Sequence, residues 1–216
     1  MKHFMSKIIS SKTRSKKFND VFLRNEWASQ ESYSGTGSTK QNTEFLVKEL
    51  KSTFLKLNIQ SVLDVPCGDF NWISKALPAH VRYIGGDISK DLIRKLNKTD
   101  NPKNIVFKRI DICKDKLPKS DIILIRDCFV HLSFKDIELA ISNLQRSEIG
   151  YFALTSFVTR THNQDSKTGM DWRALNMQII PFNFPKPLIV IDEKCTEGEG
   201  KFKDKSICIW SKNQLF

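Results

Sequence analysis

Hydrophobic residues fall into two alternating patterns from residue 61 onward. Short apolar runs, of the kind that form buried strands, are followed by segments whose apolar residues recur at helical spacing. The strand-like runs are residues 61–65, 81–87, 104–111, 121–127 and 150–157. Strands that alternate with helices predict parallel β-α-β units with right-handed crossovers. The sequence therefore predicts an α/β fold with a doubly wound sheet.

The segment before residue 59 has a purely helical pattern. Phe18, Val21 and Phe22 share one helical face. Ser38 followed by Gln41 predicts a capping box that opens a second helix, which carries its own apolar stripe. We therefore expect a helical extension in front of the sheet domain.

The end of the chain departs from the alternation. Residues 187–193 and 205–212 are apolar runs joined by a charged turn, which predicts an antiparallel hairpin. Residues 156–186 show little periodicity apart from a candidate helical turn at 171–178, and a long aromatic-bearing loop in a compact domain is typically functional. The predicted organisation is a basic, flexible tail over residues 1–17, a helical cap over 18–58, and a main domain over 59–216 with a substrate loop over 156–186.

Charge is uneven along the 216 residues. The formal net charge is +11, and the first 24 residues hold seven Lys or Arg against one Asp. This basic segment is either a solvated tail or a contact for phosphates and other anions. The five cysteines form no C-x-x-C pair, which favours a reducing, cytoplasmic compartment. No apolar run approaches the length of a membrane span, and no feature of the sequence indicates an oligomeric state.

Four strand-like runs end at an aspartate, namely Asp64, Asp87, Asp111 and Asp127. The first three are separated by 23 and 24 residues, so each β-α unit delivers one carboxylate to the same edge of the sheet. Ligands of open α/β sheets bind beyond the carboxyl ends of the strands. A binding site is therefore expected where these carboxylates meet.

The positions of these carboxylates suit an adenosine. Asp87 can accept both hydroxyls of a ribose, and Asp111 can accept an adenine amine while the N–H of Ile112 faces a ring nitrogen. Ile88 offers an apolar face to the base. The loop after the first strand has only Gly68 for a close backbone approach and lacks the G-x-G-x-x-G that binds pyrophosphate, so it favours an adenosine without phosphates.

Four stretches carry a family resemblance: VLDVPCGDFNW, YIGGDIS, KRIDI and DIILIRDCFVHLS resemble the class I S-adenosylmethionine-dependent methyltransferases over residues 61–133. The usual first motif is D-x-G-x-G, and Pro66 here replaces its first glycine. The segments S-G-x-G-S and T-G-x-D-W-R-x-L-N are similar to a group of bacterial methyltransferase-like proteins. The resemblance implies a Rossmann-like, mostly parallel seven-stranded sheet with a C-terminal antiparallel hairpin, and S-adenosyl-L-methionine as cofactor.

The resemblance also implies a role for each matching residue. Asp64, Cys67 and Gly68 would line the methionine part of the cofactor, and Asp87 would hold the ribose with Ile88 beside the base. Asp111 and Ile112 would bind the adenine, while Arg126 and Asp127 would flank the sulfonium. The alternative is an α/β protein that has lost its cofactor.

Methyl transfer to a hydroxyl needs a positioned nucleophile and removal of its proton. His131, four residues past Asp127, is the best candidate base because its ordinary pKa suits proton removal at neutral pH, and Asp127 is the second candidate. A histidine that braces the loop through a hydrogen bond is the alternative. The N/D-P-P-Y/F motif of many base-methylating amine methyltransferases is replaced by RDCF, which disfavours that class.

Three cysteines follow strand ends. Cys128 lies where cytosine-C5 methyltransferases place a nucleophile, but the neighbouring proline is absent, so a small buried thiol is the favoured interpretation. Cys67, Cys113 and Cys128 together lack the paired spacing of a metal site, and we expect no metal.

Three functions compete. The first is O-methylation of a small molecule or glycan, in which Trp172 stacks on a ring and Arg173 and Asn176 bind polar groups. The second is an RNA methyltransferase that uses the basic segment; nucleic acid is not favoured, because no RNA-binding module is visible. The third is a non-catalytic cofactor-binding or scaffold protein.

Overall fold

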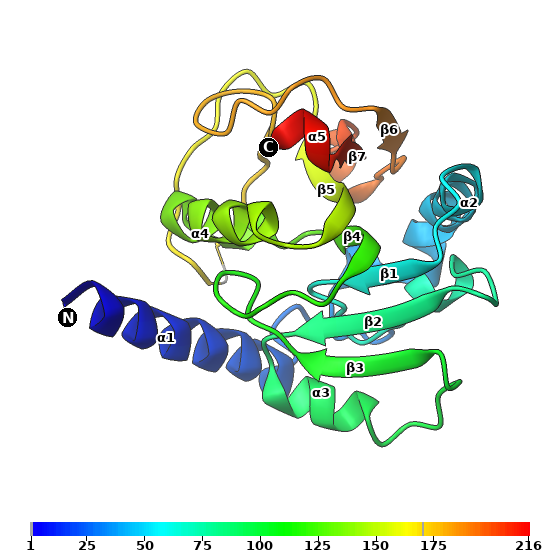
Figure 1. The fold of residues 1–216 in the computed structure, drawn as a ribbon, viewed down its shortest axis with the longest axis horizontal. Coiled ribbons are helices and arrows are strands. Elements are labelled where there is room, and N and C mark those ends of the chain that lie inside the picture. Colours follow the sequence, from blue (N-terminus) through cyan, green and yellow to red (C-terminus); the bar gives the residue numbers. More distant parts are fainter. Residues whose placement is uncertain (1, 170) are drawn as a thin grey trace.

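The computed structural model describes residues 2–169 and 171–216, with side chains described from Thr13 onward. Seven strands form one sheet in the order β3-β2-β1-β4-β5-β7-β6, shown in Figure 1. They are β1 Ser61–Asp64, β2 Arg82–Asp87, β3 Ile105–Arg109, β4 Ser120–Ile125, β5 Ile149–Phe157, β6 Ile189–Asp192 and β7 Lys205–Ser211. All neighbouring pairs are parallel except those of β7, which runs antiparallel to β5 and to β6. The predicted doubly wound sheet with a C-terminal antiparallel hairpin is confirmed.

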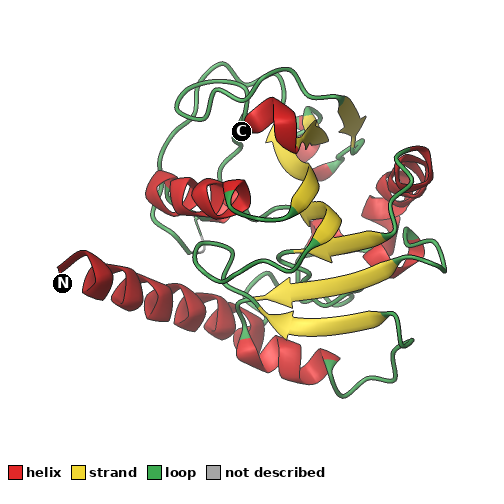
Figure 2. Ribbon diagram, in the orientation of Figure 1, coloured by secondary structure: helices red, strands yellow, loops and turns green. Residues whose placement is uncertain are grey.

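Helices cover both faces of the sheet (Figure 2). Because successive strand residues point to opposite faces, Val62 and Leu63 belong to different cores. Leu63 packs in one core with Ile137 of α4 (Phe134–Gln145), and Val62 packs in the other with Leu50 of α2 (Lys40–Lys56) and Leu92 of α3 (Lys90–Leu96). Fully burying one such side chain contributes about 1.5–3 kcal/mol. The two cores hold the strand ends in place for the site described below.

The N-terminal segment differs from its prediction as a flexible tail over residues 1–17. Helix α1 spans Lys2–Arg24 and packs against α3. Asn19 joins the two helices, since its side chain donates to Asp91 at 2.8 Å and accepts from Ser89 at 3.0 Å. The physical reason for the difference is Arg14, which lies buried beside carboxylates of the main domain. The distribution of basic residues in the sequence did not show that Arg14 pairs with buried carboxylates of the main domain.

One local prediction also differs. The cap of α2 is Thr39, whose side chain accepts from the N–H of Asn42, whereas Ser38 ends the short 3₁₀ helix η1 (Thr36–Ser38). After β1 the chain forms the single 3₁₀ turn η2 (Ile73–Lys75). Helix α4 is capped by Ser133, whose side chain accepts from the N–H of Asp136.

The remaining elements are short. They are η3 (Phe129–His131), η4 (Glu197–Gly200) and α5 (Lys212–Leu215). The segment from 171 to 188 contains no helix, so the candidate turn at 171–178 is not helical there. Within the described part of the chain, none of the helices has the length and apolar composition that crossing a bilayer requires.

Candidate active site

The four predicted carboxylates meet at one cavity. Asp64, Asp87, Asp111 and Asp127 all line a cavity of about 540 Å³ at the carboxyl ends of the parallel strands. This volume lies within the range of small-molecule and cofactor sites, about 300–1,000 Å³. We call the part lined by Asp64, Asp87 and Asp111 the β1–β3 end. The part lined by Arg126, Asp127 and Lys205 is the β4–β7 end, and the buried Glu193 lies beneath it, paired with Arg126 and Lys205.

The loop after β1 requires its glycine. Gly68 has φ = 53°, in the left-handed region, and a Cβ there would lie 2.1 Å from the hydroxyl oxygen of Ser34. The N–H of Cys67 donates to the carbonyl of Gly86 at 2.8 Å, which ties the loop to β2. Cys67 and Gly68 both line the cavity. Gly68 therefore permits the close approach of the segment around Ser34, and its predicted close approach to a cofactor stays a prediction.

The carboxylates of β1 and β2 are buried with little compensating charge. Burial raises the pKa of Asp64 to about 7, against the opposing effect of the Tyr83 hydroxyl, which donates to it at 2.7 Å. Burial likewise raises the pKa of Asp87 to about 6, although the backbone N–H groups of Ser89, Gly68 and Ile88 stabilise its ionised form. Both carboxyl groups are thus poised to ionise fully when a ligand supplies hydrogen-bond donors or positive charge.

Asp111 is held from two sides. Its Oδ1 accepts from the N–H of Cys113 at 3.0 Å, and its Oδ2 accepts from Arg14 at 3.1 Å. A carboxylate oxygen can accept more than one donor, so this pairing leaves capacity for a ligand amine. Ile112 and Ile88 also line the cavity, as predicted. Arg14 is an unpredicted wall residue at this end.

The segment that precedes α2 forms one wall of the cavity. Residues 33–38 line the cavity, and the side chain of Asn71 holds them by donating to the carbonyl of Ser38 at 3.1 Å. A Cβ at Gly37 would lie 2.7 Å from a carboxylate oxygen of Glu197. The glycines of S-G-T-G-S were therefore the signal of a close approach, but the sequence did not show to what.

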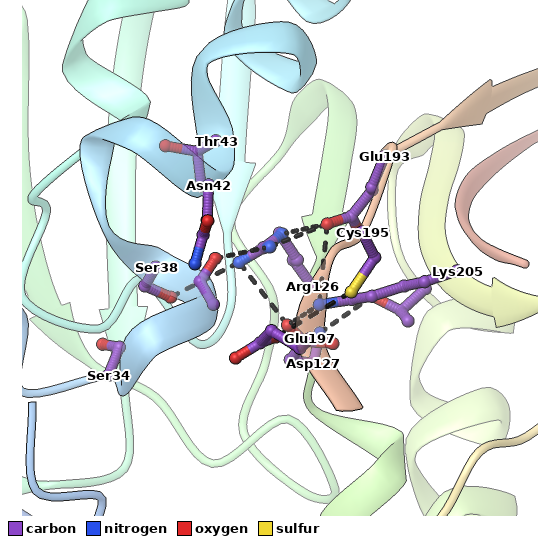
Figure 3. Close-up of polar contacts among 12 residues, drawn as sticks. Ser34, Ser38, Asn42, Thr43, Arg126, Asp127, Glu193, Cys195, Glu197 and Lys205 are labelled. Carbon is purple, nitrogen blue, oxygen red and sulfur yellow. Dashed lines mark hydrogen bonds and ion pairs between the residues drawn. The ribbon is translucent and has the colours of Figure 1, made fainter. Parts of the chain in front are cut away.

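The β4–β7 end contains a buried charge cluster, drawn in Figure 3. Asp127, at φ = 51°, accepts from Lys205 at 2.6 Å, and its N–H donates to the Thr155 hydroxyl at 2.9 Å. Burial alone would raise the pKa of Asp127, but Lys205 and Arg126 outweigh burial and lower it to about 2. Asp127 is therefore ionised at every pH at which the protein would be assayed.

Arg126 lines the cavity but is committed to protein partners. Its Nε and Nη2 donate to Glu193 at 3.1 and 2.7 Å, and Nη2 also donates to the Gly37 carbonyl at 2.9 Å. Nη1 donates to the Ser38 hydroxyl at 3.3 Å. The guanidinium therefore joins β4 to the hairpin and to η1. This geometry makes it a brace of the site, and the predicted place of Arg126 beside a sulfonium stays a prediction.

His131 lies where a base would be useful. It lines the cavity, is 9% exposed, and its ring lies 5.4 Å from that of Trp27, between centroids. Its Nδ1 has no hydrogen-bond partner among the described residues. Burial lowers its pKa below the ordinary value, against the raising effects of Asp127 and of hydrogen bonds to the backbone of Asp171 and Gly169. The ring is thus neutral at pH 7 and able to take a proton.

The three predicted acceptor-binding residues have different positions. Trp172 lines the cavity, is 39% exposed, and packs edge-on against Phe202 with centroids 4.6 Å apart. Arg173 does not line it, because its guanidinium donates to main-chain carbonyls that include those of Phe129 and Val130. Asn176 is buried and its side chain donates to the carbonyl of Arg160 at 2.9 Å. Arg173 and Asn176 therefore hold the loop instead of facing a ligand.

The thiols at the cavity are chemically quiet. Cys67, Cys113 and Cys128 line it, and burial raises the pKa of each. They are therefore protonated at neutral pH, which disfavours a nucleophilic role for Cys128. Among the side chains that the structure describes, no group of three or more His, Cys, Asp or Glu is placed to hold a metal ion.

The sequence missed the residues that the hairpin contributes. Glu193 follows β6, and Lys205 begins β7, which is antiparallel and so starts at the carboxyl edge of the parallel strands. Both side chains are buried. The hairpin was predicted, but its position beside β5 was not, so nothing placed these charges near β4.

Solved structures show which fold this is. One similar structure is human N-acetylserotonin methyltransferase in complex with S-adenosylmethionine, with a TM-score of 0.55 and 9% identity over 76% of this chain and 50% of the human enzyme. Another is an S-adenosylmethionine-dependent methyltransferase from Clostridium acetobutylicum, with a TM-score of 0.56 and 12% identity over 77% of this chain and 90% of that protein. The chain thus spans about half the length of the human enzyme.

No family model matches the chain, and no curated protein matches its sequence. At these identities the likeness to solved structures shows a shared fold alone. The fold of this chain is that of the S-adenosylmethionine-dependent methyltransferases.

Proposed function

We propose that this chain is an S-adenosylmethionine-dependent methyltransferase that methylates a hydroxyl of a small molecule or glycan. The observation that carries the proposal is the convergence of Asp64, Asp87 and Asp111 with His131 on one cavity. Three carboxylates from successive strands suit an adenosine, and a neutral histidine at the next strand suits proton removal. The likeness to methyltransferase structures supports the same cofactor.

The β1–β3 end fits the cofactor on structural grounds. Asp87 is held by backbone N–H groups, lines the cavity and has a raised pKa, as expected for an acceptor that awaits the hydroxyls of a ribose. Asp111 and the N–H of Ile112 would hold the adenine, beside Ile88. The backbone at Cys67 and Gly68, together with Asp64, would hold the methionine part. When bound, S-adenosylmethionine supplies a methyl group on a positively charged sulfur.

The β4–β7 end would then hold the acceptor. His131 would take the proton of the acceptor hydroxyl at a ring nitrogen, while the bound cofactor would supply the methyl group to the hydroxyl oxygen. Asp127 stabilises the protonated ring, since its carboxylate raises the pKa of His131. Trp172 presents an exposed aromatic edge for a ring of the acceptor.

RNA is a second candidate acceptor, and one observation favours it. Residues 90–119 carry ten Lys or Arg, all of them exposed, against four Asp. Together with the exposed Lys16, Lys17 and Arg24 of α1, these residues give this part of the exterior a positive charge. RNA binding that weakens steeply between 50 and 200 mM salt would support this candidate.

Titration with S-adenosylhomocysteine tests the cofactor assignment. Asp87→Ala removes two charge-assisted hydrogen bonds to the ribose and should weaken binding by roughly 2–4 kcal/mol. Asp100→Ala is the control, because Asp100 is exposed and does not line the cavity. Equal affinity of the two variants, measured by calorimetry, would reject the ribose assignment. Failure of the wild type to bind at all would leave the non-catalytic scaffold as the better reading.

A further inference from the structure

The charge cluster at the β4–β7 end combines five ionised side chains from three strands and a turn. Arg126 and Asp127 follow β4, Glu193 follows β6, Lys205 begins β7, and Glu197 lies in η4. Figure 3 shows these side chains pointing toward one another between η1 and the hairpin. Three carboxylates thus face two cations in a largely buried place, so the cluster has an excess of negative charge.

The donors of this cluster are already used. Every nitrogen of the Arg126 guanidinium has a protein partner, and its Nη1 additionally lies 3.4 Å from Asp127. Lys205 is 4% exposed, and its ammonium lies 2.6 Å from Asp127 and 3.5 Å from Glu193. An anionic ligand would therefore find no uncommitted guanidinium, and the single charge of Lys205 is already shared between two carboxylates.

The acceptors, by contrast, are in surplus. Among the described residues, Oδ1 of Asp127 and Oε1 of Glu193 have no hydrogen-bond partner, and neither has Nδ1 of His131. His131 is nine-tenths buried and Glu193 is 3% exposed. All three atoms are shielded from solvent, and a buried acceptor without a donor costs about 1–3 kcal/mol. Two of them belong to residues that line the cavity, Asp127 and His131, and these would gain from a ligand that supplies donors.

The whole cavity has the same imbalance. Of its described lining residues, six are Asp or Glu and three are Arg or Lys, although the protein as a whole is strongly basic. Arg14, one of the three cations, is paired with Asp111 and Asp136. The cavity therefore favours cationic or neutral ligands, whereas the exterior attracts anions.

We propose, on the basis of the function proposed above, that the group docking at the β4–β7 end is a neutral or cationic hydrogen-bond donor, an alcohol or an amine. Carboxylates and phosphates are excluded from this position. Two carboxylates of the cluster, Asp127 and Glu197, line the cavity. Asp127 determines this specificity, because its Oδ1 has no hydrogen-bond partner among the described residues, whereas Glu197 accepts from the hydroxyl of Thr36. Lys205 is a positioning residue that holds the other oxygen of Asp127.

Three matched probes test this proposal: benzyl alcohol, benzylamine and benzoate, which share a ring and differ in the group on its substituent carbon. Their binding is measured by ligand-observed NMR on protein saturated with S-adenosylhomocysteine. We expect the alcohol and the amine to bind at least tenfold more tightly than benzoate. Asp127→Asn should reduce the preference of benzylamine over benzoate by roughly tenfold or more. Asp192→Asn, the same change outside the cavity, should leave it unchanged.

The proposal is overturned if benzoate binds as well as the other two probes, if neither donor probe binds, or if Asp127→Asn leaves the preference intact. Cofactor binding is read separately, by titrating S-adenosylhomocysteine alone. A protein that binds this molecule but shows no preference among the probes rejects only the charge specificity. A protein that does not bind it rejects the proposed function itself.

Discussion

At the β1–β3 end of the cavity, Asp64 and Asp87 are buried beside a tyrosine hydroxyl and backbone N–H groups, whereas at the β4–β7 end Asp127 is buried beside two cations. The same side chain at the end of a parallel strand therefore has opposite properties. The pKa of Asp64 is raised to about 7 and that of Asp127 is lowered to about 2. A ligand that brings positive charge would stabilise the ionised forms of Asp64 and Asp87. Asp127 stays ionised with or without a ligand.

This difference separates two tasks. At the β1–β3 end a cationic cofactor and a proton compete for Asp64 and Asp87, so binding of the cofactor should release protons from them. At the β4–β7 end, stabilising the protonated form of His131 requires a negative charge that is present at all times, which Asp127 provides. The comparison therefore predicts that substitutions at the β1–β3 end change cofactor affinity and that those at the β4–β7 end change rate and acceptor choice.

The largest effect is expected from His131→Ala. Loss of the base should lower the rate of methyl transfer by roughly 10²–10⁴ while the affinity for S-adenosylhomocysteine stays the same. The wild-type rate should fall as pH drops through the pKa of His131, which lies below its ordinary value, because the protonated ring cannot accept a proton. A variant that instead loses stability and cofactor affinity together would show that His131 braces the loop.

An intermediate effect is expected from a matched pair of amide substitutions, Asp127→Asn and Asp64→Asn, which should shift the melting temperature in opposite directions. Shifts in the same direction would contradict the comparison between the two ends of the cavity. Asp127→Asn removes the charge that Lys205 and Arg126 face and should lower the melting temperature at pH 7 by several degrees. By contrast, Asp64→Asn should raise the melting temperature at pH 8. Because the folded-state pKa of Asp64 is raised, its stability contribution is present at acidic pH and is lost as pH rises through about 7.

Melting curves of the two variants at pH 5 and pH 8 check this prediction. At pH 5 Asp64 is mostly protonated, so its amide variant should melt close to the wild type. At pH 8 the same variant should be more stable but bind S-adenosylhomocysteine less tightly, since it cannot supply a charge. A lower melting temperature of Asp64→Asn at pH 8 would show that the carboxylate stabilises the empty protein.

Much of the β1–β3 end could be predicted from the sequence because it depends on local order. A strand, its terminal aspartate and the next helix are consecutive, and the parallel sheet brings successive units to one edge. The spacing of the strands was sufficient to predict that Asp64, Asp87 and Asp111 lie together. The turn between strand and helix was sufficient to predict the position of Gly68.

The β4–β7 end depends on contacts between distant residues, and these the sequence could not supply. Glu193 and Lys205 are 67 and 78 residues from Arg126 and Asp127, their respective partners. Their placement requires the hairpin to enter the sheet with β7 beside β5. Arg173 and Asn176 differ from their prediction as ligand contacts for a related reason. Their partners are main-chain carbonyls, and a sequence pattern does not indicate which carbonyls a folded loop presents.

The smallest effect is expected from Arg14→Met, which probes how α1 covers the β1–β3 end. Arg14 pairs with Asp111 at 3.1 Å and with Asp136 at 2.5 Å, and Phe18 and Phe22 of the same helix line the cavity. Methionine keeps an unbranched side chain but removes the cation, so α1 should pack less firmly. A loss of about 1 kcal/mol corresponds to roughly fivefold, which should appear as faster dissociation of S-adenosylhomocysteine.

Stopped-flow dissociation measures this rate directly. Arg24→Met is the matched control, because Arg24 lies on the same helix with 72% of its side chain exposed and pairs only loosely with Glu26, at 3.5 Å. Equal dissociation rates for the two variants would mean that α1 does not cover the cofactor. Faster dissociation from Arg14→Met alone would place α1 in the β1–β3 end as a wall that must shift when the cofactor leaves. Asp111 would then accept from the guanidinium of Arg14 and from the adenine amine in the same complex.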